Sequence, residues 1–365
     1  MDDSQDGLSD FDHYLMVVSA FCGYSEKQNQ IIDVLESDFH SIPQDHQQLI
    51  LEYQHKLDSL RSCVDSNSSF LKTVAKSPPF FPINVQDSEA VRSSFRKALN
   101  GDLMFYHDQH EKVYATLKSL FREWSIEGKP ERDQAFQPLV DCICNRFPDK
   151  SNRSNVKILV PGCGLGRLVH EFARLGFDSL GLEFSFFMVL MSGFVLNRTK
   201  TAEEITIFPF IHSLLNTKTN SDLLRPIKIP DISVTDFGDT IPQLSICAGD
   251  FVDALTEENH FDVICCSFFL DTARDIVEYL KIIYKILKPG GILVSIGPLT
   301  WHWNKSTCQG SFVSIELSHE EIMLLLPRIG FKVIKNDWMT CQYCQEPNSL
   351  SKSEYNCFYF EAIKE

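Results

Sequence analysis

The chain has 365 residues, of which 44% are hydrophobic, a composition typical of a globular protein with one large domain or two moderate ones. Its net charge is −15 at pH 7, and it has no run of five or more Lys and Arg, so a nucleic-acid partner is disfavoured. The longest apolar stretch, 184–196, is shorter than the roughly 20 residues that a membrane-spanning helix needs. The acidic, polar start of the chain predicts neither a secretory signal nor a transit peptide.

Cysteine usage points to a reducing compartment. The 12 cysteines show no disulfide spacing, and several, such as Cys247, Cys265 and Cys266, fall in apolar runs typical of buried strands. Cys341 and Cys344 have half of a zinc-binding spacing, but no second pair of this kind follows, so we expect no metal site. We expect a cytoplasmic protein, with the nucleus as an alternative location.

The first 150 residues are predicted to form a helical region. Three segments there carry apolar residues at three- and four-residue spacing: 9–36, 44–75 and 106–124. The proline-rich run 77–82 interrupts this pattern and predicts a connection. A further helix is expected over 132–147, followed by a polar turn at 148–155.

Residues 151–365 are predicted to form an α/β domain, because short apolar strands alternate with helices. The expected strands are 156–160, 177–182, 244–248, 262–267, 292–296, 331–336 and 355–363, and the expected helices are 167–175, 185–197, 273–287 and 318–329. This order favours a mostly parallel sheet with helices on both faces. The last two strands have no helix between them, which predicts an antiparallel strand at the end of the sheet. Residues 198–243 show little periodicity, and we expect them to be an insertion beside the site.

A glycine-rich turn follows the first strand directly and precedes a helix. Its glycines, Gly162, Gly164 and Gly166, would let the backbone turn sharply and approach a ligand at the helix N-terminus. A dinucleotide fingerprint would place the third glycine at 167, which is Arg. The tighter spacing seen here is the one found in methyltransferases.

Two further strand ends carry residues suited to an adenosine. Glu183 ends the second strand, where an acidic group can accept both hydroxyls of a ribose. Asp250 and Phe251 close the third strand and could bind the adenine amino group and cover the ring. A Lys-Pro-Gly-Gly run at 288–291 adds a fourth element in the same order.

Several longer runs resemble the N2227-like methyltransferases, whose characterised members are carnosine N-methyltransferases. The resemblance extends from about residue 10 to the C-terminus, and its most specific runs are 121–124 (Phe-Arg-Glu-Trp), 131–133, 160–168, 185–188, 194–198, 248–251 and 269–273 (Phe-Leu-Asp-Thr-Ala). It implies a class I S-adenosylmethionine (SAM)-dependent methyltransferase fold, with a Rossmann-like sheet, helices on both faces and a helical N-terminal extension that caps the cofactor site.

The resemblance implies SAM as the methyl donor. Family cofactor positions fall here on Arg122, Gly162, Gly164, Gly166, Glu183, Asp250, Phe251 and Ser267. Arg122 lies before the sheet begins, so the N-terminal helices would fold over the cofactor. Its guanidinium group suits the methionine carboxylate.

The resemblance also implies methyl transfer to an imidazole nitrogen of a histidine-containing dipeptide, from carnosine to anserine. Its substrate positions fall on Asp271, His302, Tyr343 and Tyr355. A neutral imidazole has one bare nitrogen and one N–H. A carboxylate that accepts this N–H, the role expected of Asp271, would aim the bare nitrogen at the methyl group and stabilise the imidazolium that forms. His302 would share that role, and the two tyrosines would wall the pocket.

The chain departs from the family pattern at three positions. Ser267 stands where Cys is expected, Ser353 where a third Tyr is expected, and Phe184 where Trp is common. The missing Tyr leaves open another imidazole compound or a peptide as the acceptor. A SAM-binding partner protein without catalysis and an NAD-linked oxidoreductase are the alternatives, the latter disfavoured by the glycine spacing. We expect no nucleic-acid or membrane partner and allow for a homodimer.

Overall fold

The computed structural model describes residues 9–77, 89–100, 109–238, 240–306 and 313–365. The proline-rich connection expected at 77–82 therefore lies, apart from Ser77, outside the described residues. None of the described helices is both long enough and apolar enough to cross a bilayer.

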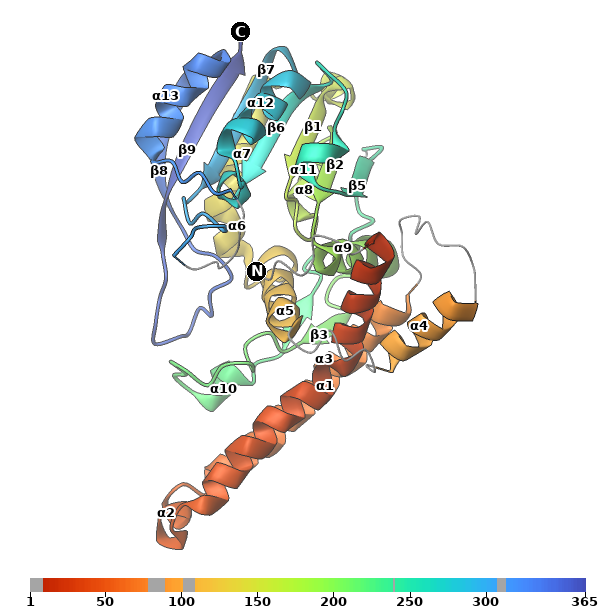
Figure 1. The fold of residues 1–365 in the computed structure, drawn as a ribbon, viewed down its shortest axis with the longest axis vertical. Coiled ribbons are helices and arrows are strands. Elements are labelled where there is room, and N and C mark those ends of the chain that lie inside the picture. Colours follow the sequence, from red (N-terminus) through yellow and green to blue (C-terminus); the bar gives the residue numbers. More distant parts are fainter. Residues whose placement is uncertain (1–8, 78–88, 101–108, 239, 307–312) are drawn as a thin grey trace.

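A seven-stranded sheet forms the centre of the C-terminal part (Figure 1). Its strands, in spatial order, are β5 (Gln243–Ala248), β2 (Asp178–Glu183), β1 (Lys157–Pro161), β6 (Phe261–Ser267), β7 (Leu287–Gly297), β9 (Tyr355–Lys364) and β8 (Phe331–Cys341). The first five run parallel, and β9 runs antiparallel to both of its neighbours. This arrangement confirms the predicted class I methyltransferase sheet, including the reversed strand near its end.

Helices cover both faces of the sheet because its buried strands carry apolar residues on both sides. On one face Leu159, Ile264 and Leu293 pack against α12 (Ile276–Ile286) and α13 (His319–Ile329). On the other face the alternate residues, such as Ile158 and Val263, pack against three helices. These are α6 (Lys129–Ala135), α7 (Gln137–Arg146) and α8 (Arg167–Arg174).

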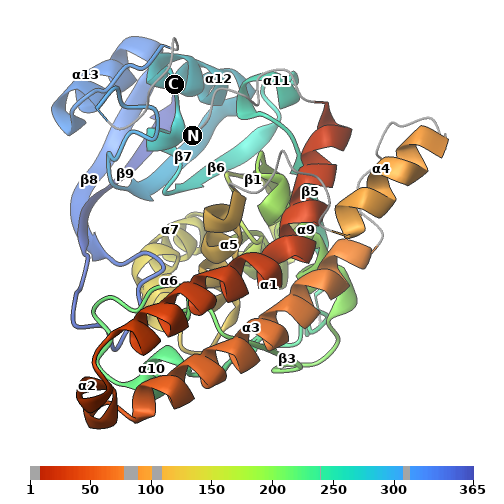
Figure 2. The same ribbon diagram turned by 60° about the horizontal axis from the view of Figure 1, so that its bottom comes forward.

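The N-terminal part is helical, as predicted, and its two longest helices form a hairpin that projects away from the sheet (Figures 1 and 2). Its helices are α1 (Asp10–Ser41), α2 (Gln44–Leu49), α3 (Glu52–Lys76), α4 (Glu89–Leu99) and α5 (His110–Trp124). Helix α1 begins at a capping box in which the Ser9 and Asp12 side chains each accept the other's backbone N–H. Helix α4 was not predicted, and the helix expected over 44–75 is divided at Ile50, whose backbone is not helical.

The helix expected over 132–147 is two helices that meet at Phe136. Pro138, in the first turn of α7, explains the break, because proline cannot donate the hydrogen bond that a continuous helix would give to the carbonyl of Gln134. That carbonyl instead accepts a hydrogen bond from the Cys341 thiol, over 3.7 Å.

The stretch 198–243 joins α9 (Phe186–Arg198) to β5 and has more structure than its sequence suggested. It holds a small antiparallel sheet of β3 (Ile205–Ile207) and β4 (Ile227–Ile229), with α10 (Asn220–Leu223) between them. Its buried isoleucines, such as Ile207, share one apolar core with α1, α3, α5 and α9. The stretch therefore packs on the N-terminal helices.

Candidate functional site

The glycine loop after β1 has the strained geometry that only glycine adopts readily. Gly162, Gly164 and Gly166 have φ of +61°, +57° and +80°. A Cβ on Gly164 would lie 2.6 Å from Oε1 of Glu123, and a Cβ on Gly162 would lie 2.7 Å from the Phe269 ring. Side chains therefore approach this backbone from the N-terminal helices and from the loop after β6.

Glu183, at the end of β2, faces the glycine loop. Its Oε2 accepts the backbone N–H of Gly164 and its Oε1 accepts that of Ser185, each over 2.8 Å. The residue is only 9% exposed, and this burial raises the pKa of its carboxyl group to about 7. A carboxylate has about four acceptor sites, so two are left for the hydroxyls of a ribose.

Arg122 is buried near the end of α5, and its guanidinium group is short of hydrogen bonds. Its Nε and Nη2 have no partner, and the nearest carboxylate oxygens, from Glu131 and Glu123, are 3.8 and 3.9 Å away. The guanidinium lies over the rings of Phe136 and Tyr343, 4.8 and 4.6 Å from their centroids. Unsatisfied buried donors are costly, and a carboxylate ligand would satisfy both nitrogens. The predicted role of Arg122 toward the methionine carboxylate fits this geometry.

Glu123, the next residue, binds the backbone of the glycine loop. This role was not predicted from the sequence. Its carboxylate accepts the backbone N–H groups of Leu165 and Arg167 over 3.1–3.2 Å, at the positive N-terminal end of α8. Burial raises its pKa. The one feature of the sequence that singles out Glu123 is its place in the run 121–124. Its partner loop lies about 40 residues further along the chain, so the sequence does not link the two.

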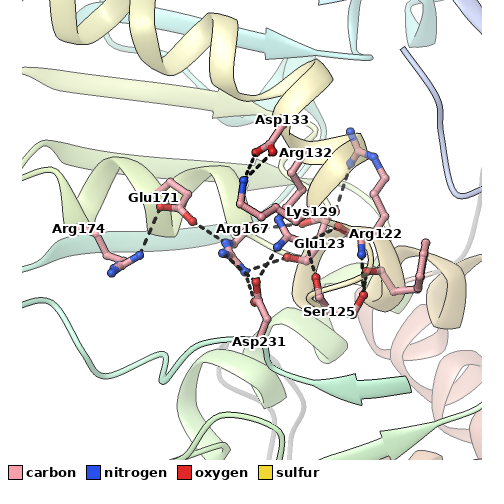
Figure 3. A network of polar contacts seen from close by, with 12 residues as sticks. Arg122, Glu123, Ser125, Lys129, Arg132, Asp133, Arg167, Glu171, Arg174 and Asp231 are labelled. Carbon is pink, nitrogen blue, oxygen red and sulfur yellow. Dashed lines mark hydrogen bonds and ion pairs between the residues drawn. The ribbon is translucent and has the colours of Figure 1, made fainter. Parts of the chain in front are cut away.

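A buried ion network fixes α5, α6, α8 and the insertion together (Figure 3). Asp231 accepts from Arg132 Nη2 over 2.6 Å and from the guanidinium of Arg167. Arg132 Nη1 also donates to the carbonyl oxygens of Arg122 and Ser125, over 2.8 and 2.7 Å. The network therefore positions the backbone of Arg122 against the glycine loop, although Asp231 was not expected to take part.

The residues predicted for the adenine follow β5. Asp250 is exposed, and its Oδ1 accepts the Val252 N–H over 2.8 Å, which caps the short helix α11 (Phe251–Ala254). Phe251 is 4% exposed and its ring packs against Phe269 and Tyr279, with centroids 5.1 and 4.9 Å apart. Phe184, after Glu183, is 60% exposed.

The end of β6 connects the predicted cofactor and acceptor residues. The Oγ of Ser267 is buried without a hydrogen-bond partner, so it can serve a ligand. Phe268, which sequence reasoning missed, has a φ of +54°, a strained conformation for this residue type. Its ring lies 4.9 Å from that of Tyr343 and 6.1 Å from that of Tyr355. The structure thus brings the two predicted tyrosines together around Phe268.

Asp271 lies in a short 3₁₀ turn after β6 and is 2% exposed. Its Oδ2 accepts from the backbone N and the hydroxyl of Thr300, over 2.9 and 2.6 Å. Its Oδ1 makes no hydrogen bond to a described residue. The backbone N of His302 donates to the carbonyl oxygen of Asp271 over 3.0 Å, while the His302 side chain is exposed. These two predicted residues are thus linked through the backbone.

A cavity of about 470 Å³ lies between α5, the insertion and the segment after β8. Its lining includes Lys118 and Ser119 of α5, His212 of the insertion, and Tyr343 and Cys344 after β8. Tyr343 therefore forms part of this cavity and also contacts Arg122 and Phe268. The volume is in the range of small-molecule sites.

The described residues contain no group of three or more His, Cys, Asp and Glu side chains placed to hold a metal ion. The Cys341 thiol donates to the Gln134 carbonyl, and the Cys344 thiol lies 4.0 Å from Ser119 Oγ. The two cysteines of the half zinc spacing therefore have separate partners.

The chain is similar to a family of known function over most of its length. The sequence profile described as carnosine N-methyltransferase matches residues 101–365. The carnosine N-methyltransferase of Rattus norvegicus is 34% identical over 97% of this chain and 86% of its own length. The carnosine N-methyltransferase of Dictyostelium discoideum is 35% identical over 97% of this chain and 77% of its own length. That of Schizosaccharomyces pombe is 31% identical over 94% of this chain and 93% of its own length. The chain belongs to the carnosine N-methyltransferase family of SAM-dependent methyltransferases.

Proposed function

We propose that this chain methylates an imidazole nitrogen of carnosine with Asp271 as the group that orients the ring and accepts its proton. The activity follows from the family: the chain is a SAM-dependent carnosine N-methyltransferase, which converts carnosine to anserine. Family membership also sets aside the NAD-linked oxidoreductase. When bound, SAM supplies an electrophilic methyl group on its sulfonium sulfur.

Four features of this chain support SAM as the cofactor. Arg122 has two buried donors without partners, Ser267 has a buried hydroxyl without one, and Glu183 keeps unused acceptor sites beside the glycine loop. The fourth feature is the glycine loop itself, whose Gly162, Gly164 and Gly166 all have the positive φ that glycine adopts readily. We assign the methionine carboxylate to Arg122 and the ribose hydroxyls to Glu183.

The observation that carries the proposed role of Asp271 is its half-occupied carboxylate. Thr300 holds Oδ2 in place, and Oδ1 is left for the N–H of an imidazole. In that pose Oδ1 would hold the ring N–H and keep the bare ring nitrogen aimed at the methyl group that SAM would supply, and Oδ1 would take the surplus proton of the methylated ring. Tyr343 and Tyr355 would enclose the ring from the Phe268 side, and His302 would receive the proton further out.

The replacement Asp271→Asn tests this role. Asparagine keeps the side-chain shape but cannot take the proton, so we expect kcat with carnosine to fall about 10²–10⁴-fold. SAM affinity, measured by calorimetry, should stay within about twofold. Transfer of label from methyl-labelled SAM to anserine gives the rate.

Asp337→Asn is the matched control, because Asp337 lies exposed on β8 and contacts its neighbour Trp338. This variant should turn over as the wild type does. Undiminished kcat in Asp271→Asn would reject the role of Asp271. Wild-type protein that binds SAM but labels neither carnosine nor any other imidazole compound or peptide would reject the acceptor.

We also propose a cytoplasmic or nuclear location and a homodimer. The support for the location is that all 11 cysteines among the described residues are unpaired, as in a reducing compartment. The support for the dimer is the exposed apolar tip of the α1–α3 hairpin, where Val34, Leu49 and Leu51 are 60–81% exposed. Cell fractionation tests the location, and light scattering of the purified chain tests the homodimer.

A further inference from the structure

Helix α5 presents Lys118 and Arg122 on one face, because residues four apart lie one helical turn from each other. The Arg122 guanidinium lies over the rings of Phe268 and Tyr343, and we assign it to the cofactor. Lys118 lies one turn further from the sheet and lines the cavity of about 470 Å³. The two cations therefore serve neighbouring parts of one site.

Lys118 lacks an acidic partner although the chain has a net charge of −15. Among the described residues, no carboxylate oxygen forms an ion pair with its ammonium group. Other half-buried cations differ: Arg225 pairs with Glu127 and Glu346, and Lys288 pairs with Asp262. Lys118 is also the one Lys or Arg side chain among the described residues that line the cavity.

The aromatic side chains that line the cavity with Lys118 are polar but uncharged. His212 Nε2 and the Tyr24 hydroxyl form a hydrogen bond over 2.7 Å. The His212 ring stacks on that of Tyr114, with ring centroids 4.0 Å apart. Burial lowers the pKa of His212 to about 3, so its ring is neutral at pH 7. The one acid in the lining, Glu111, is 78% exposed and lies 3.4 Å from His110. A negatively charged ligand group would meet Lys118 without facing a nearby buried acid.

The cavity and the acceptor residues share Tyr343, which lines the cavity and contacts both the Phe268 ring and the Arg122 guanidinium. A ligand whose imidazole reaches Asp271 can therefore extend past Tyr343 toward Lys118. Resting on the proposed function, we infer that Lys118 binds the carboxylate of the dipeptide acceptor and makes the enzyme select imidazole compounds that carry a free carboxylate. An ammonium group with three donors and no competing acid is suited to this role.

The test compares two acceptors, carnosine and β-alanylhistamine, which has the same imidazole and amine but no carboxylate. Wild-type enzyme should favour carnosine. In Lys118→Met, the KM for carnosine should rise about 10- to 100-fold, the range expected for a lost hydrogen bond to a charged group. The KM for β-alanylhistamine, the kcat and the SAM affinity should stay unchanged. Lys118→Arg, which keeps the charge, should recover most of the preference.

Lys112→Met, on the same helix but outside the cavity lining, is the control and should behave as the wild type. Equal losses for both acceptors would overturn the inference, because a structural effect does not depend on the carboxylate. A drop in SAM affinity alone would also overturn it and assign Lys118 to the cofactor. If the wild type methylates neither compound, the proposed function fails together with the inference; if it methylates carnosine and Lys118→Met is unaffected, only the inference fails.

Discussion

The residues that define the site are ionisable groups held out of water with part of their hydrogen-bonding capacity unused. Arg122 lacks partners for two nitrogens, Glu183 has a raised pKa, and one oxygen of Asp271 is tied to Thr300. Each arrangement costs folding free energy in the absence of a ligand. Their shared position at the carboxyl ends of the parallel strands is where folds of this type bind ligands.

Glu183 makes cofactor binding depend on pH. Burial raises its pKa from the ordinary 4.5 to about 7, so the carboxylate form dominates only above pH 7. SAM affinity should therefore weaken as the pH falls from 8 to 6, because the protonated carboxyl loses the charge that strengthens its hydrogen bonds to the ribose. Calorimetric titrations across this range should show the trend in wild type and a flat profile in Glu183→Gln.

The same pKa shift affects folding in the opposite sense. The folded chain holds the Glu183 proton more tightly than the unfolded chain does. The contribution of this group to the free energy of unfolding is therefore largest below pH 4.5 and is lost as the pH rises through 7. An identical pH profile of SAM affinity in wild type and Glu183→Gln would show that another group controls it.

At the scale of elements, Asp231 joins the insertion to α6 and α8, the helices that carry Arg132 and Arg167. Its side chain is 5% exposed and accepts from Arg132 and Arg167 (Figure 3). Its backbone N–H donates to the carbonyl oxygen of Trp124 over 2.8 Å. A segment that looks like a loop in the sequence thus fixes the end of α5.

Asp231→Asn should lower the free energy of unfolding by about 3–5 kcal/mol, because it leaves the buried Arg132 without its counter-charge and Arg167 with Glu171 alone. Urea denaturation measures the loss, and hydrogen exchange should increase at 162–168. Lys129→Met is the control: it breaks the Lys129–Asp133 pair, whose side chains are 58% and 50% exposed, and should cost less than about 1 kcal/mol. Equal costs for the two variants would contradict the role of the Asp231 network.

How far the sequence predicts the site depends on how local each signal is. The glycine loop and Glu183 were predictable because a strand, a turn and a helix follow one another along the chain. The position of Arg122 came only from the family resemblance, since nothing local separates it from a surface charge. Glu123 and Asp231 could not be predicted, because their partners are set by the packing of α5 and the insertion. The split at Phe136 was readable from Pro138, whereas we have no physical account of the one at Ile50.

At the scale of the whole molecule, the N-terminal helices and the methyltransferase sheet meet in shared contacts. One apolar core contains residues of α1, α3 and α5 together with Leu165 of the glycine loop and Phe187 of α9. The indole Nε1 of Trp124 donates to the Leu165 carbonyl over 3.1 Å. The predicted boundary near residue 150 therefore does not separate two independent cores.

The full chain should unfold in one cooperative transition. Calorimetry should give a van't Hoff enthalpy close to the calorimetric enthalpy, and SAM should shift the whole transition to higher temperature. If the helices and the sheet were independent, two transitions would appear and SAM would move only the one that contains the sheet. That outcome would contradict the shared core.

The seating of α5 beneath the glycine loop has a consequence for how a ribosome makes this protein. Helices α1 and α3 can pair as soon as both have emerged, but Glu123 and Trp124 must wait for residues 165–167, and Arg132 must wait for Asp231. At about 5–20 residues per second, roughly 5–20 s of translation separate residue 125 from residue 231. During that interval the nascent chain carries charged groups that become buried in the folded protein but whose partners have not yet been synthesised. The site for the cofactor is therefore completed only in the second half of synthesis.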